Sequence, residues 1–363
     1  MSDVLFEINN GVGEIILNRP AALNALNFNM VEAMTEKLLA WKDDASIKMV
    51  VLRATPGRAF CAGGDIRAAY DEGSSHGQMP EVGSLKDLFF RKEYFLDHMI
   101  HTYPKPYISL IDGINMGGGL GISMGGVRVI TENALMAMPE TGIGLFPDVG
   151  GSYFLNQCPG HIGRYLGLTG YRLDAQDCLY AGFGTHFIES KNLDGFLEKL
   201  RACGGGSKPV QEAKVLLGDL QGYRSGSALE AAQKDIDDHF KHDFVEGIIS
   251  SLESDASEFA QKALKMLSGK SPTSLKVTLE QLRRGKDLDI AHVFRMEYRL
   301  TQNFMAGTDF FEGVRALLVD KDKNPQWSPA TLADVGDDTV ASYFESLGQE
   351  ELHLSDDADV MSA

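Results

Sequence analysis

The sequence predicts an α/β fold followed by a helical region. Two glycine-rich loops, residues 60–66 and 113–121, each follow an apolar run with strand character, at residues 49–52 and 107–111. Strand-like and helix-like segments alternate through the first half of the chain, and such alternation is typical of βαβ units. After about residue 190 the chain changes to charged segments with helical periodicity. These three observations together indicate an α/β core with a helical region after it.

The first elements in chain order are a hairpin, a helix and a strand. Residues 4–8 and 12–17 have strand character and flank Asn-Asn-Gly at residues 9–11, which is a strong turn signal. Over residues 28–43 apolar side chains recur at helical spacing, and this spacing predicts a helix. A strand over residues 49–54 then leads into the first glycine-rich loop.

The remaining elements follow from the same periodicities. An amphipathic helix is expected over residues 84–100, and after the second glycine-rich loop begins a further helix is expected over about residues 118–125. In the second half, the pattern predicts helices over residues 228–240, 256–268, 274–284 and 290–304.

This organisation predicts two domains and a tail. At 363 residues the chain exceeds the average size of one compact unit. We expect the α/β core over residues 1–200, a helical C-terminal region over residues 201–345 and an acidic, frayed tail over residues 346–363. Residues 204–208, Gly-Gly-Gly-Ser-Lys, resemble a linker close to the boundary between the two domains.

Charge and composition exclude several classes of partner. The net charge is −17, whereas nucleic acids and anionic membranes require a basic face, so neither is expected as a partner. A hydrophobic content of 44% is ample for a packed core. The four cysteines are widely spaced without a zinc-like grouping, which favours a reduced protein. With no recognisable signal peptide, mitochondrial transit segment or membrane span, we expect a cytoplasmic location.

The two glycine-rich loops are suited to binding negative charge through the backbone. Because glycine lacks a Cβ, a ligand can approach the chain closely and several N–H groups can converge on it. Where a helix follows such a loop, its first N–H groups are unpaired and its dipole favours negative charge. Two such loops brought together would form a pocket for a developing oxyanion. The second loop lacks the frame of a dinucleotide-binding motif, because no acidic residue follows at the required distance.

Glu93 is the first candidate for acid–base chemistry. Phe89, Leu96 and Ile100 share its stripe on the expected helix, at positions i−4, i+3 and i+7. A carboxylate on an apolar stripe is costly unless it is neutral, paired or directed into a pocket. The alternative is an edge position whose carboxylate extends to solvent, and spacing alone does not choose between the two.

Glu140 and Asp148 are the second and third candidates. The segment 138–151 is rich in glycine and proline yet apolar between its two acids, as a buried functional loop would be. Asp148 has an alternative interpretation as the N-cap of a helix over residues 149–155, a common role for aspartate after a turn. Glu140, which follows Met138 and Pro139, has a similar alternative as an acid in the first turn of a helix.

Histidines and cysteines do not indicate metal or nucleophile chemistry. His98, His101, His161 and His186 are scattered and no pair has metal-ligand spacing, so structural roles and no metal site are expected. Cys61, beside the first glycine-rich loop, is expected to be a small packing residue. The chain has no GxSxG elbow, so a serine hydrolase of the α/β-hydrolase pattern is unsupported.

Motifs of the first half occur in an order that resembles the crotonase (enoyl-CoA hydratase/isomerase) superfamily. They are Asn-Arg-Pro at residues 18–20 with Leu-Asn-Ala-Leu at 23–26, the loop at 60–66, and Met-Gly-Gly-Gly at 116–119. The resemblance implies a crotonase-like spiral of repeated ββα units that binds acyl-CoA and polarises the thioester carbonyl with two backbone N–H groups. By position, the resemblance assigns these two donors to Gly64 and Gly118.

The resemblance also assigns residues to the CoA moiety. Backbone around Ala25, Leu26, Ala62, Asp65 and Ile66 is expected to contact the substrate. For the CoA phosphates the candidates are the arginines at positions 58 and 67, each of which has the alternative of a solvated surface charge. No cofactor is expected, since CoA is part of the substrate.

Within the superfamily the match narrows to one branch. In the hydratases one glutamate lies three residues after the second oxyanion glycine, where this chain has Gly121, while the second hydratase glutamate corresponds to Glu140. Water addition uses both acids, so the loss of one argues against a hydratase. The segments that resemble the 3-hydroxyisobutyryl-CoA hydrolases instead are residues 91–94, 138–141, 144–151, 271–276, 296–300 and 311–322.

This narrower resemblance implies substrate contacts at Glu93, Gly118, Glu140 and Asp148. It implies hydrolysis of 3-hydroxyisobutyryl-CoA to CoA and 3-hydroxyisobutyrate, as in valine breakdown, with 3-hydroxypropionyl-CoA as a second substrate. Glu140 would attack the carbonyl to form an anhydride or activate a water, and Asp148 would orient the substrate hydroxyl or assist proton transfer. Glu93 would support these two acids.

Two alternatives stay open. The chain could be an enoyl-CoA hydratase or isomerase for a short-chain acyl-CoA, against which the glycine at position 121 counts. It could also be an acyl-CoA-binding module without turnover, but binding alone requires neither Glu140 nor Asp148. A homo-oligomer is compatible with the superfamily resemblance.

Overall fold

The computed structural model describes residues 2–73, 79–220, 222 and 225–354. These residues form two compact units, and neither unit is a continuous stretch of chain. The first unit takes the described residues of Met1–Gly64, Leu96–Met136 and Arg172–Ala231, and the second takes those of Asp65–Phe95, Ala137–Tyr171 and Ala232–Ala363.

The expected domain boundary between residues 200 and 201 is not a point where the chain passes from one unit to the other. It lies within a helix of the first unit, and residues 205–208 join that helix to the next one in the same unit. The sequential division into a core and a helical region therefore stays a prediction. Of the expected tail, residues 346–354 are described, and residues 355–363 lie outside the described residues.

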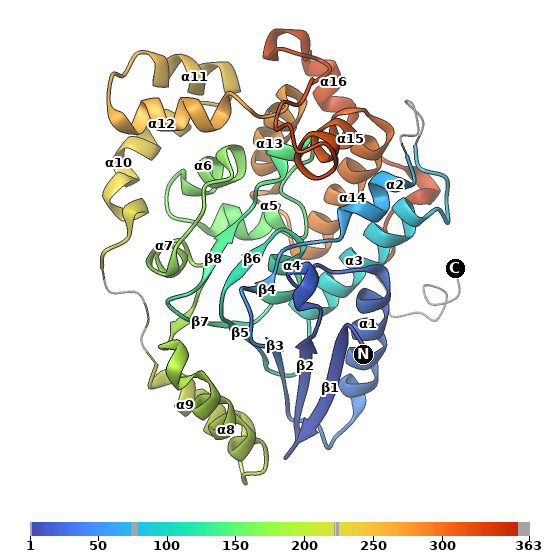
Figure 1. Cartoon of the computed structure of the whole chain (residues 1–363), viewed down its shortest axis with the longest axis vertical. Coiled ribbons are helices and arrows are strands. Elements are labelled where there is room, and N and C mark those ends of the chain that lie inside the picture. Colours follow the sequence, from blue (N-terminus) through green and yellow to red (C-terminus); the bar gives the residue numbers. More distant parts are fainter. Residues whose placement is uncertain (1, 74–78, 221, 223–224, 355–363) are drawn as a thin grey trace. The chain divides into compact units, whose positions relative to one another are not determined.

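A long sheet forms the frame of the first unit (Figure 1). In the described part of the chain its strand order is β1-β2-β3-β5-β7-β9, with β1 antiparallel to β2 and the later neighbours parallel. Asn10 and Gly11 both have positive φ, at 52° and 82°, which is why Asn-Gly suits the turn of the opening hairpin. The strands are β1 (Val4–Asn9), β2 (Val12–Leu17), β3 (Met49–Ala54), β5 (Tyr107–Ile111), β7 (Val127–Ile130) and β9 (His186–Phe187).

Three short strands form a second sheet, in the order β4-β6-β8. They are β4 (Ala59–Cys61), β6 (Ile114–Met116) and β8 (Leu135–Ala137). Strands of the two sheets alternate along the chain, since β3, β5 and β7 belong to the long sheet and each is followed by a strand of the short one. This alternation, with a helix after β4 and after β6, is the repeated ββα pattern expected for a crotonase-like core, and it confirms the expected fold class.

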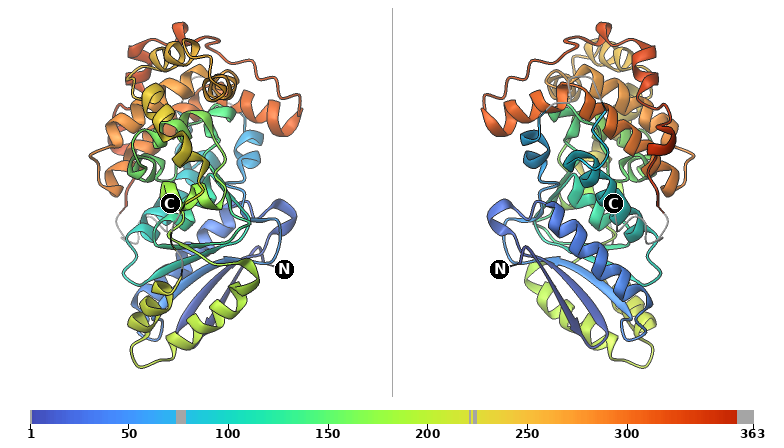
Figure 2. Two further views of the ribbon diagram at one scale, coloured as in Figure 1. Left: turned by 90° about the vertical axis from the view of Figure 1, so that its left-hand side faces the viewer. Right: turned by 90° about the vertical axis from the view of Figure 1, so that its right-hand side faces the viewer.

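Helices cover both faces of the long sheet. The helices of the first unit are η1 (Pro20–Ala22), α1 (Phe28–Asp43), α4 (Gly118–Met124), α7 (Ala175–Ala181), η4 (Ser190–Asn192), α8 (Leu193–Gly204) and α9 (Pro209–Gly218). A Cβ on Gly13 would lie 2.8 Å from the Trp41 ring, so α1 packs directly on that face of β2. The neighbouring Val12 faces the other side, in a core shared with Phe196, Leu200 and Leu217 of α8 and α9. Figure 2 shows α1 and the α8–α9 pair on opposite faces of the sheet.

Helices make up most of the second unit. α13 packs against α5 and α6, α14 packs against α5, and α12 packs against α11 and α6. The first part of α3 (Leu85–His101) and most of α10 (Ala228–Phe240) also belong to this unit. Its other helices are α2 (Ile66–Asp71), η2 (Glu140–Ile143), α5 (Gly151–Phe154), η3 (Leu155–Gln157), α6 (Ile162–Thr169), α11 (Val245–Glu253), α12 (Glu258–Leu267), α13 (Pro272–Gly285), α14 (Ile290–Ala306), α15 (Asp309–Val314), the π-helical turn η5 (Arg315–Val319), η6 (Leu332–Asp334), α16 (Asp337–Ser342) and η7 (Gly348–Glu350).

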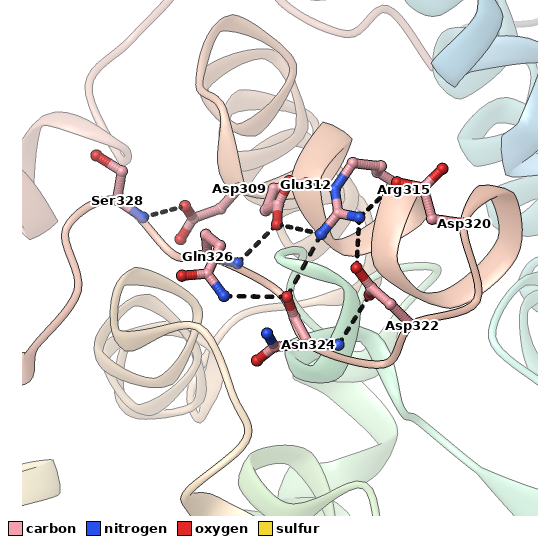
Figure 3. Close-up of polar contacts among 8 residues, drawn as sticks. All are labelled: Asp309, Glu312, Arg315, Asp320, Asp322, Asn324, Gln326 and Ser328. Carbon is pink, nitrogen blue, oxygen red and sulfur yellow. Dashed lines mark hydrogen bonds and ion pairs between the residues drawn. The ribbon is translucent and has the colours of Figure 1, made fainter.

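A charged cluster in the second unit fixes the chain that follows α15 (Figure 3). The Arg315 guanidinium binds Glu312 through Nε and Nη2, both at 2.8 Å, in a bidentate pair. Its Nη1 reaches Asp320 at 2.6 Å and Asp322 at 2.7 Å, and Glu312 also accepts the N–H of Gln326. The cluster therefore holds residues 315–326 in a compact loop.

Most expected helices agree with the structure to within two residues. α1 and α10 begin and end at the expected residues, and the other helices expected after residue 190 differ from α12, α13 and α14 by at most two residues at either end. α13 begins earlier than expected because Ser271 caps it through the N–H of Ser274 at 3.0 Å and Pro272 occupies its first position. The helix considered at residues 149–155 corresponds to α5, which begins two residues later, at Gly151, and is followed directly by η3.

Candidate active site

The first glycine-rich loop is held by the segment at residues 23–26. Leu26 donates its N–H to the carbonyl of Gly63 at 2.8 Å, and Ala62 donates to the carbonyl of Leu23 at 3.0 Å. Asn24 has a φ of 56° and donates through Nδ2 to the carbonyl of Ala59 at 3.0 Å. An asparagine tolerates this left-handed conformation, which explains its place in the Leu-Asn-Ala-Leu motif.

The second glycine-rich loop lies directly against the first. A Cβ on Gly63 would lie 3.2 Å from the carbonyl oxygen of Met116 and 3.7 Å from the amide nitrogen of Gly118. A Cβ on Gly119 would lie 2.7 Å from the carbonyl oxygen of Cys61, so a side chain there would separate the loops. α4 begins at Gly118 without a side-chain cap, which leaves its first N–H groups without helical partners. The structure thus places Gly118 beside Gly63, the neighbour of Gly64, in the first unit.

The other residues expected to contact CoA are divided between the units. Ala25, Leu26 and Ala62 lie in the first unit, where Leu26 is fully buried. Asp65 and Ile66 belong to the second unit, where Ile66 begins α2.

The two arginines considered for the CoA phosphates are both exposed. Arg58 is an exposed residue of the first unit, and Arg67 is exposed on α2 and pairs with Asp71 at 2.9 Å. Both arginines therefore have the exposure expected of solvated surface charges.

Asp148 lies in the second unit and is not a helix N-cap. α5 begins at Gly151, and its N-cap is Gly150, which has a φ of 89° and makes no side-chain cap. The carboxylate of Asp148 instead accepts a hydrogen bond from the Tyr94 hydroxyl, at 2.8 Å from Oδ2. The N-cap interpretation of Asp148 is therefore wrong. The N–H groups at the amino end of α5 are bound instead by a carboxylate from a helix that is distant in the sequence.

That distant carboxylate is Glu297 of α14. It is fully buried and accepts the N–H groups of Gly150 at 2.7 Å and Ser152 at 2.8 Å. Gln281 of α13 holds the same turn, because its Nε2 donates to the carbonyl of Pro147 and to the Ser152 hydroxyl. Burial is the main cause that raises the pKa of Glu297 to about 8, against the lowering effect of the Ser152 and Gly150 hydrogen bonds.

Glu93 and Glu140 are buried in the same unit, with side chains that lack complete partners. Glu93 is 2% exposed and Glu140 is 5% exposed, and Oε1 of Glu93 and Oε2 of Glu140 have no hydrogen-bond partner. The interpretation of Glu93 as a solvent-reaching edge position is therefore wrong. Glu140 is the first residue of η2, so the first-turn interpretation is right for its position, although its unpartnered oxygen is buried.

The three acids influence one another's ionisation. Burial raises the pKa of Glu93 and of Glu140 well above the ordinary value, and the charge of Asp148 raises both further. Lys270 acts in the opposite direction on the pKa of Glu140. Burial raises the pKa of Asp148 only to about 6, because the Tyr94 hydrogen bond lowers it. This order makes Asp148 the ionised member of the cluster at neutral pH, and it favours the neutral forms of the two glutamates.

Tyr94, Glu297 and Gln281 were missed by analysis of the sequence. Tyr94 follows Glu93 in the segment 91–94, and Glu297 lies in the segment 296–300. Both segments contributed to the family resemblance, and that resemblance was the available signal. No spacing rule connects Asp148 with a residue almost 150 positions later in the chain.

The described residues contain no group of three or more histidine, cysteine, aspartate or glutamate side chains that could hold a metal ion. In the same residues no helix has the length and apolarity needed to cross a bilayer. Cys61 is buried with its Sγ 3.8 Å from the carbonyl of Gly63, as a packing residue would be. Burial raises the pKa of Cys158 to about 12, which keeps this thiol protonated and unreactive.

Comparison with known proteins decides the family. Residues 12–344 match the family described as Enoyl-CoA hydratase/isomerase. The chain belongs to the crotonase family. The match covers both compact units, and the resemblance identified in the sequence is therefore confirmed.

Curated relatives of this crotonase-family protein are similar over nearly its whole length. A protein from Xenopus tropicalis is 47% identical over 349 residues, which cover 94% of this chain and 88% of the relative. A protein from Homo sapiens is 42% identical over 359 residues, which cover 96% of this chain and 90% of the relative. Both relatives are named 3-hydroxyisobutyryl-CoA hydrolase, mitochondrial.

Solved structures of similar proteins carry different names. A carnitinyl-CoA dehydratase from Mycobacterium thermoresistibile is 37% identical with a TM-score of 0.89, and the alignment covers 98% of this chain and 100% of that one. An enoyl-CoA hydratase from Rhodobacter sphaeroides 2.4.1 is 35% identical with a TM-score of 0.87, covering 97% and 100%. These two structural similarities confirm the crotonase fold over nearly the whole chain.

Proposed function

We propose that this protein is a thioester hydrolase that releases CoA and 3-hydroxyisobutyrate from 3-hydroxyisobutyryl-CoA. Relatives of that name are 42–47% identical over nearly the full chain. The observation that supports hydrolysis most directly is the burial of Glu140 and Asp148 in one coupled cluster. Binding of acyl-CoA without turnover would not require these two costly acids.

The proposed reaction begins with polarisation of the thioester carbonyl. The N–H groups of Gly64 and Gly118 are proposed to donate to the carbonyl oxygen, and each such donor contributes on the order of 3 kcal/mol to an oxyanionic transition state. Glu140 must be ionised to act. Burial raises its pKa, and a carboxylate of higher pKa is a stronger base or nucleophile once it is ionised.

Two routes lead from this point to products. In the first, Glu140 attacks the carbonyl carbon, the C–S bond breaks, CoA leaves as a thiol after gaining a proton, and water then hydrolyses the anhydride. In the second, Glu140 removes a proton from a water molecule, and that water attacks the carbonyl directly. The tetrahedral intermediate then breaks its C–S bond, and the sulfur of the departing CoA takes up the proton that Glu140 holds. In either route Asp148 is proposed to accept a hydrogen bond from the 3-hydroxyl group or to assist proton transfer.

Hydration of an enoyl-CoA is the alternative activity, and two of the structural relatives carry names of that kind. The position three residues after Gly118 is Gly121, a buried residue of α4, so the chain lacks a carboxylate there. The chain has a different second carboxylate, that of Asp148. It lies in the turn before α5 and accepts a hydrogen bond from the Tyr94 hydroxyl. A site that hydrogen-bonds a hydroxyl group discriminates strongly against substrates without one, which favours a 3-hydroxyacyl substrate.

The direct test is chromatographic measurement of free CoA released from 3-hydroxyisobutyryl-CoA, with hydration of crotonyl-CoA measured in parallel. We expect rapid CoA release and negligible hydration by the wild type. We expect Glu140→Gln to lose CoA release. Chromatography avoids thiol dyes, which the four cysteines of the protein would consume. Hydration without CoA release would overturn the proposed hydrolase, and tight binding without either product would indicate a binding module.

Oxygen-18 labelling separates the two routes. In a single turnover in labelled water, attack of water on the Glu140 carbonyl of an anhydride places label in this carboxylate, whereas the general-base route leaves the side chain unlabelled. Mass spectrometry of the peptide that contains residue 140 measures the label. Near-normal turnover by Glu140→Gln would contradict both routes.

Other features belong to the same proposal. 3-Hydroxypropionyl-CoA is proposed as a second substrate, catalysis is proposed to need no cofactor, and a homo-oligomer is compatible with the fold. The cytoplasmic location expected from the sequence is also a proposal, and the curated relatives are named mitochondrial. Cell fractionation tests the location, and light scattering after gel filtration tests the oligomeric state.

A further inference from the structure

A chain of buried oxygen atoms extends from Asp148 to the backbone of α14. The Tyr94 hydroxyl lies 2.8 Å from Oδ2 of Asp148 and 2.7 Å from Oγ1 of Thr301. Oγ1 of Thr301 in turn lies 3.0 Å from the carbonyl oxygen of Glu297. All four residues are buried in the second unit, so bulk water does not compete for these contacts.

The number of protons decides which of the three contacts are hydrogen bonds. Tyr94 and Thr301 carry one hydroxyl proton each, and an ionised Asp148 carries none. When Asp148 is ionised, Tyr94 donates to Oδ2, and the one proton of Thr301 serves either Tyr94 or the carbonyl of Glu297. One of these last two contacts therefore has no proton.

Protonation of Asp148 reverses the direction of the chain. With a proton on Oδ2, Asp148 donates to Tyr94, Tyr94 donates to Thr301, and Thr301 donates to the carbonyl of Glu297. All three contacts are then hydrogen bonds. In both states Oδ2 is bound to the Tyr94 hydroxyl, and the other carboxyl oxygen of Asp148, Oδ1, remains an acceptor.

We propose that Tyr94 and Thr301 are positioning residues that keep one oxygen of Asp148 available as a hydrogen-bond acceptor for the substrate hydroxyl in both protonation states of Asp148. This inference rests on the proposed function, because it assumes that Asp148 meets a 3-hydroxyl group. The pair acts through Asp148 and does not itself touch the substrate.

The surroundings of Asp148 explain why such a pair is useful. The titratable groups around it are Glu93 and Tyr94 from α3, Glu140 from η2 and Glu297 from α14, and Lys270 acts on this cluster through Glu140. With three other acids nearby, the Tyr94 hydroxyl is the side-chain donor that lowers the pKa of Asp148. With a pKa of about 6, Asp148 changes its protonation state between mildly acidic and neutral pH.

The test compares the full-length variants Tyr94→Phe, Thr301→Val and Thr301→Ser with the wild type. Infrared spectroscopy follows the carboxyl C=O band of Asp148 through a pH titration, and Asp148→Asn identifies the band. Loss of a hydrogen bond to a charged group is expected to raise the pKa of Asp148 by roughly one unit in Tyr94→Phe. Thr301→Val is expected to shift the pKa in the same direction by less, and Thr301→Ser is expected to restore the wild-type value.

Kinetics supply a second readout that a merely structural role would not change. The ratio of kcat/KM for 3-hydroxyisobutyryl-CoA to that for isobutyryl-CoA is expected to fall roughly tenfold in Tyr94→Phe, because an unaligned Asp148 recognises the hydroxyl poorly. Tyr107→Phe is the matched control, since Tyr107 is a buried tyrosine whose hydroxyl donates to the carbonyl of Ile122 and not to one of these acids. This control should leave the ratio and the titration unchanged.

The outcomes separate the inference from the proposed function. An unshifted Asp148 titration together with an unchanged substrate ratio in Tyr94→Phe would overturn the inference, whatever the enzyme hydrolyses. If the titration shifts as expected but the wild type releases no CoA, the proposed function fails and the pairing of Tyr94 with Asp148 stands. If Tyr94→Phe fails to fold, Thr301→Val and its rescue by Thr301→Ser carry the same test.

Discussion

Oε1 of Glu297 accepts the backbone N–H of Ser152 at 2.8 Å, although 145 residues separate them in the chain. The other oxygen of this carboxylate accepts the N–H of Gly150 at 2.7 Å, so Glu297 caps the amino end of α5 from a different helix. These two N–H groups have no partner within the helix, and the side chain of Glu297 supplies one acceptor oxygen to each. Asp148 is consequently not needed as a cap, and its side chain is directed to Tyr94 instead.

Glu297→Gln is expected to destabilise the protein by roughly 1 to 3 kcal/mol, because the amide offers one acceptor oxygen where two N–H donors must be satisfied. Urea unfolding measures the change in the free energy of unfolding. Glu253→Gln, at an exposed position of α11, is the control and should alter this free energy little. Equal effects of the two substitutions would contradict the capping role of Glu297.

Lys270 is expected to tune the ionisation of Glu140. Its Nζ lies near both Gly142 and Gly170, since a Cβ on either would be 3.2 Å from it, and its charge lowers the pKa of Glu140. Removing this charge in Lys270→Met raises that pKa further. Because Glu140 must be ionised to act, the acid limb of kcat/KM should move to higher pH by roughly half a unit.

The measurement is the pH dependence of CoA release for the wild type and for Lys270→Met. Lys265→Met, which removes an exposed lysine of α12, is the control and should leave the acid limb in place. A shift to lower pH in Lys270→Met would show that Glu140 does not act in its ionised form.

Local patterns predicted those elements whose determinants are close in sequence. α1 begins where expected because the Asn27 side chain accepts the N–H of Met30 at 2.9 Å, and its apolar residues recur at helical spacing. Glu93 was recognised as unusual because it lies on an apolar stripe, and its burial confirms that reasoning. In each case the deciding contacts lie within a few turns of one helix.

Determinants from distant parts of the chain could not be predicted in this way. Asp148 has the local pattern of an N-cap, and the residue that displaces it from this role, Glu297, lies on α14. The same limit applies to the division of the chain, because the boundary between the units at Phe95 lies inside α3 rather than in a linker. Composition and periodicity reflect local preferences. They do not show that each unit is built from three separate stretches of the chain.

Gly119→Ala is expected to disrupt the contact between the two glycine-rich loops. The new Cβ would lie 2.3 Å from Oδ1 of Asn115 and 2.7 Å from the carbonyl oxygen of Cys61, both in a fully buried region. Such overpacking costs roughly 1 to 3 kcal/mol of stability, and displacement of Gly118 should lower CoA release further. Thermal unfolding and the CoA assay measure the two effects.

Gly195→Ala is the matched control for this substitution. Gly195 lies in α8, and a Cβ there meets nothing within 4 Å. Alanine favours a helix over glycine by roughly 0.5 to 1 kcal/mol, so this variant should be slightly more stable and fully active. Full activity in Gly119→Ala as well would mean that close packing of the two loops is not required for turnover.

The buried acid cluster should make the protein less stable as the pH rises. For an acid whose pKa is higher in the folded state, the folded protein binds more protons than the unfolded chain between the two pKa values, so stability falls through that window. Burial raises the pKa of Asp148 from 3.8 to about 6 and that of Glu297 from 4.5 to about 8, and the pKa of Glu93 is also raised. The loss should therefore extend from about pH 4 to pH 8.

Glu93→Gln tests this expectation, because glutamine keeps the shape of the side chain but cannot ionise. The variant should therefore match the wild type near pH 4 and be more stable than the wild type at pH 8. Urea unfolding at both pH values measures the difference, with the exposed Glu36→Gln as the control that should not change it. A variant that is less stable than the wild type at pH 8 would contradict a raised pKa of Glu93 in the folded protein.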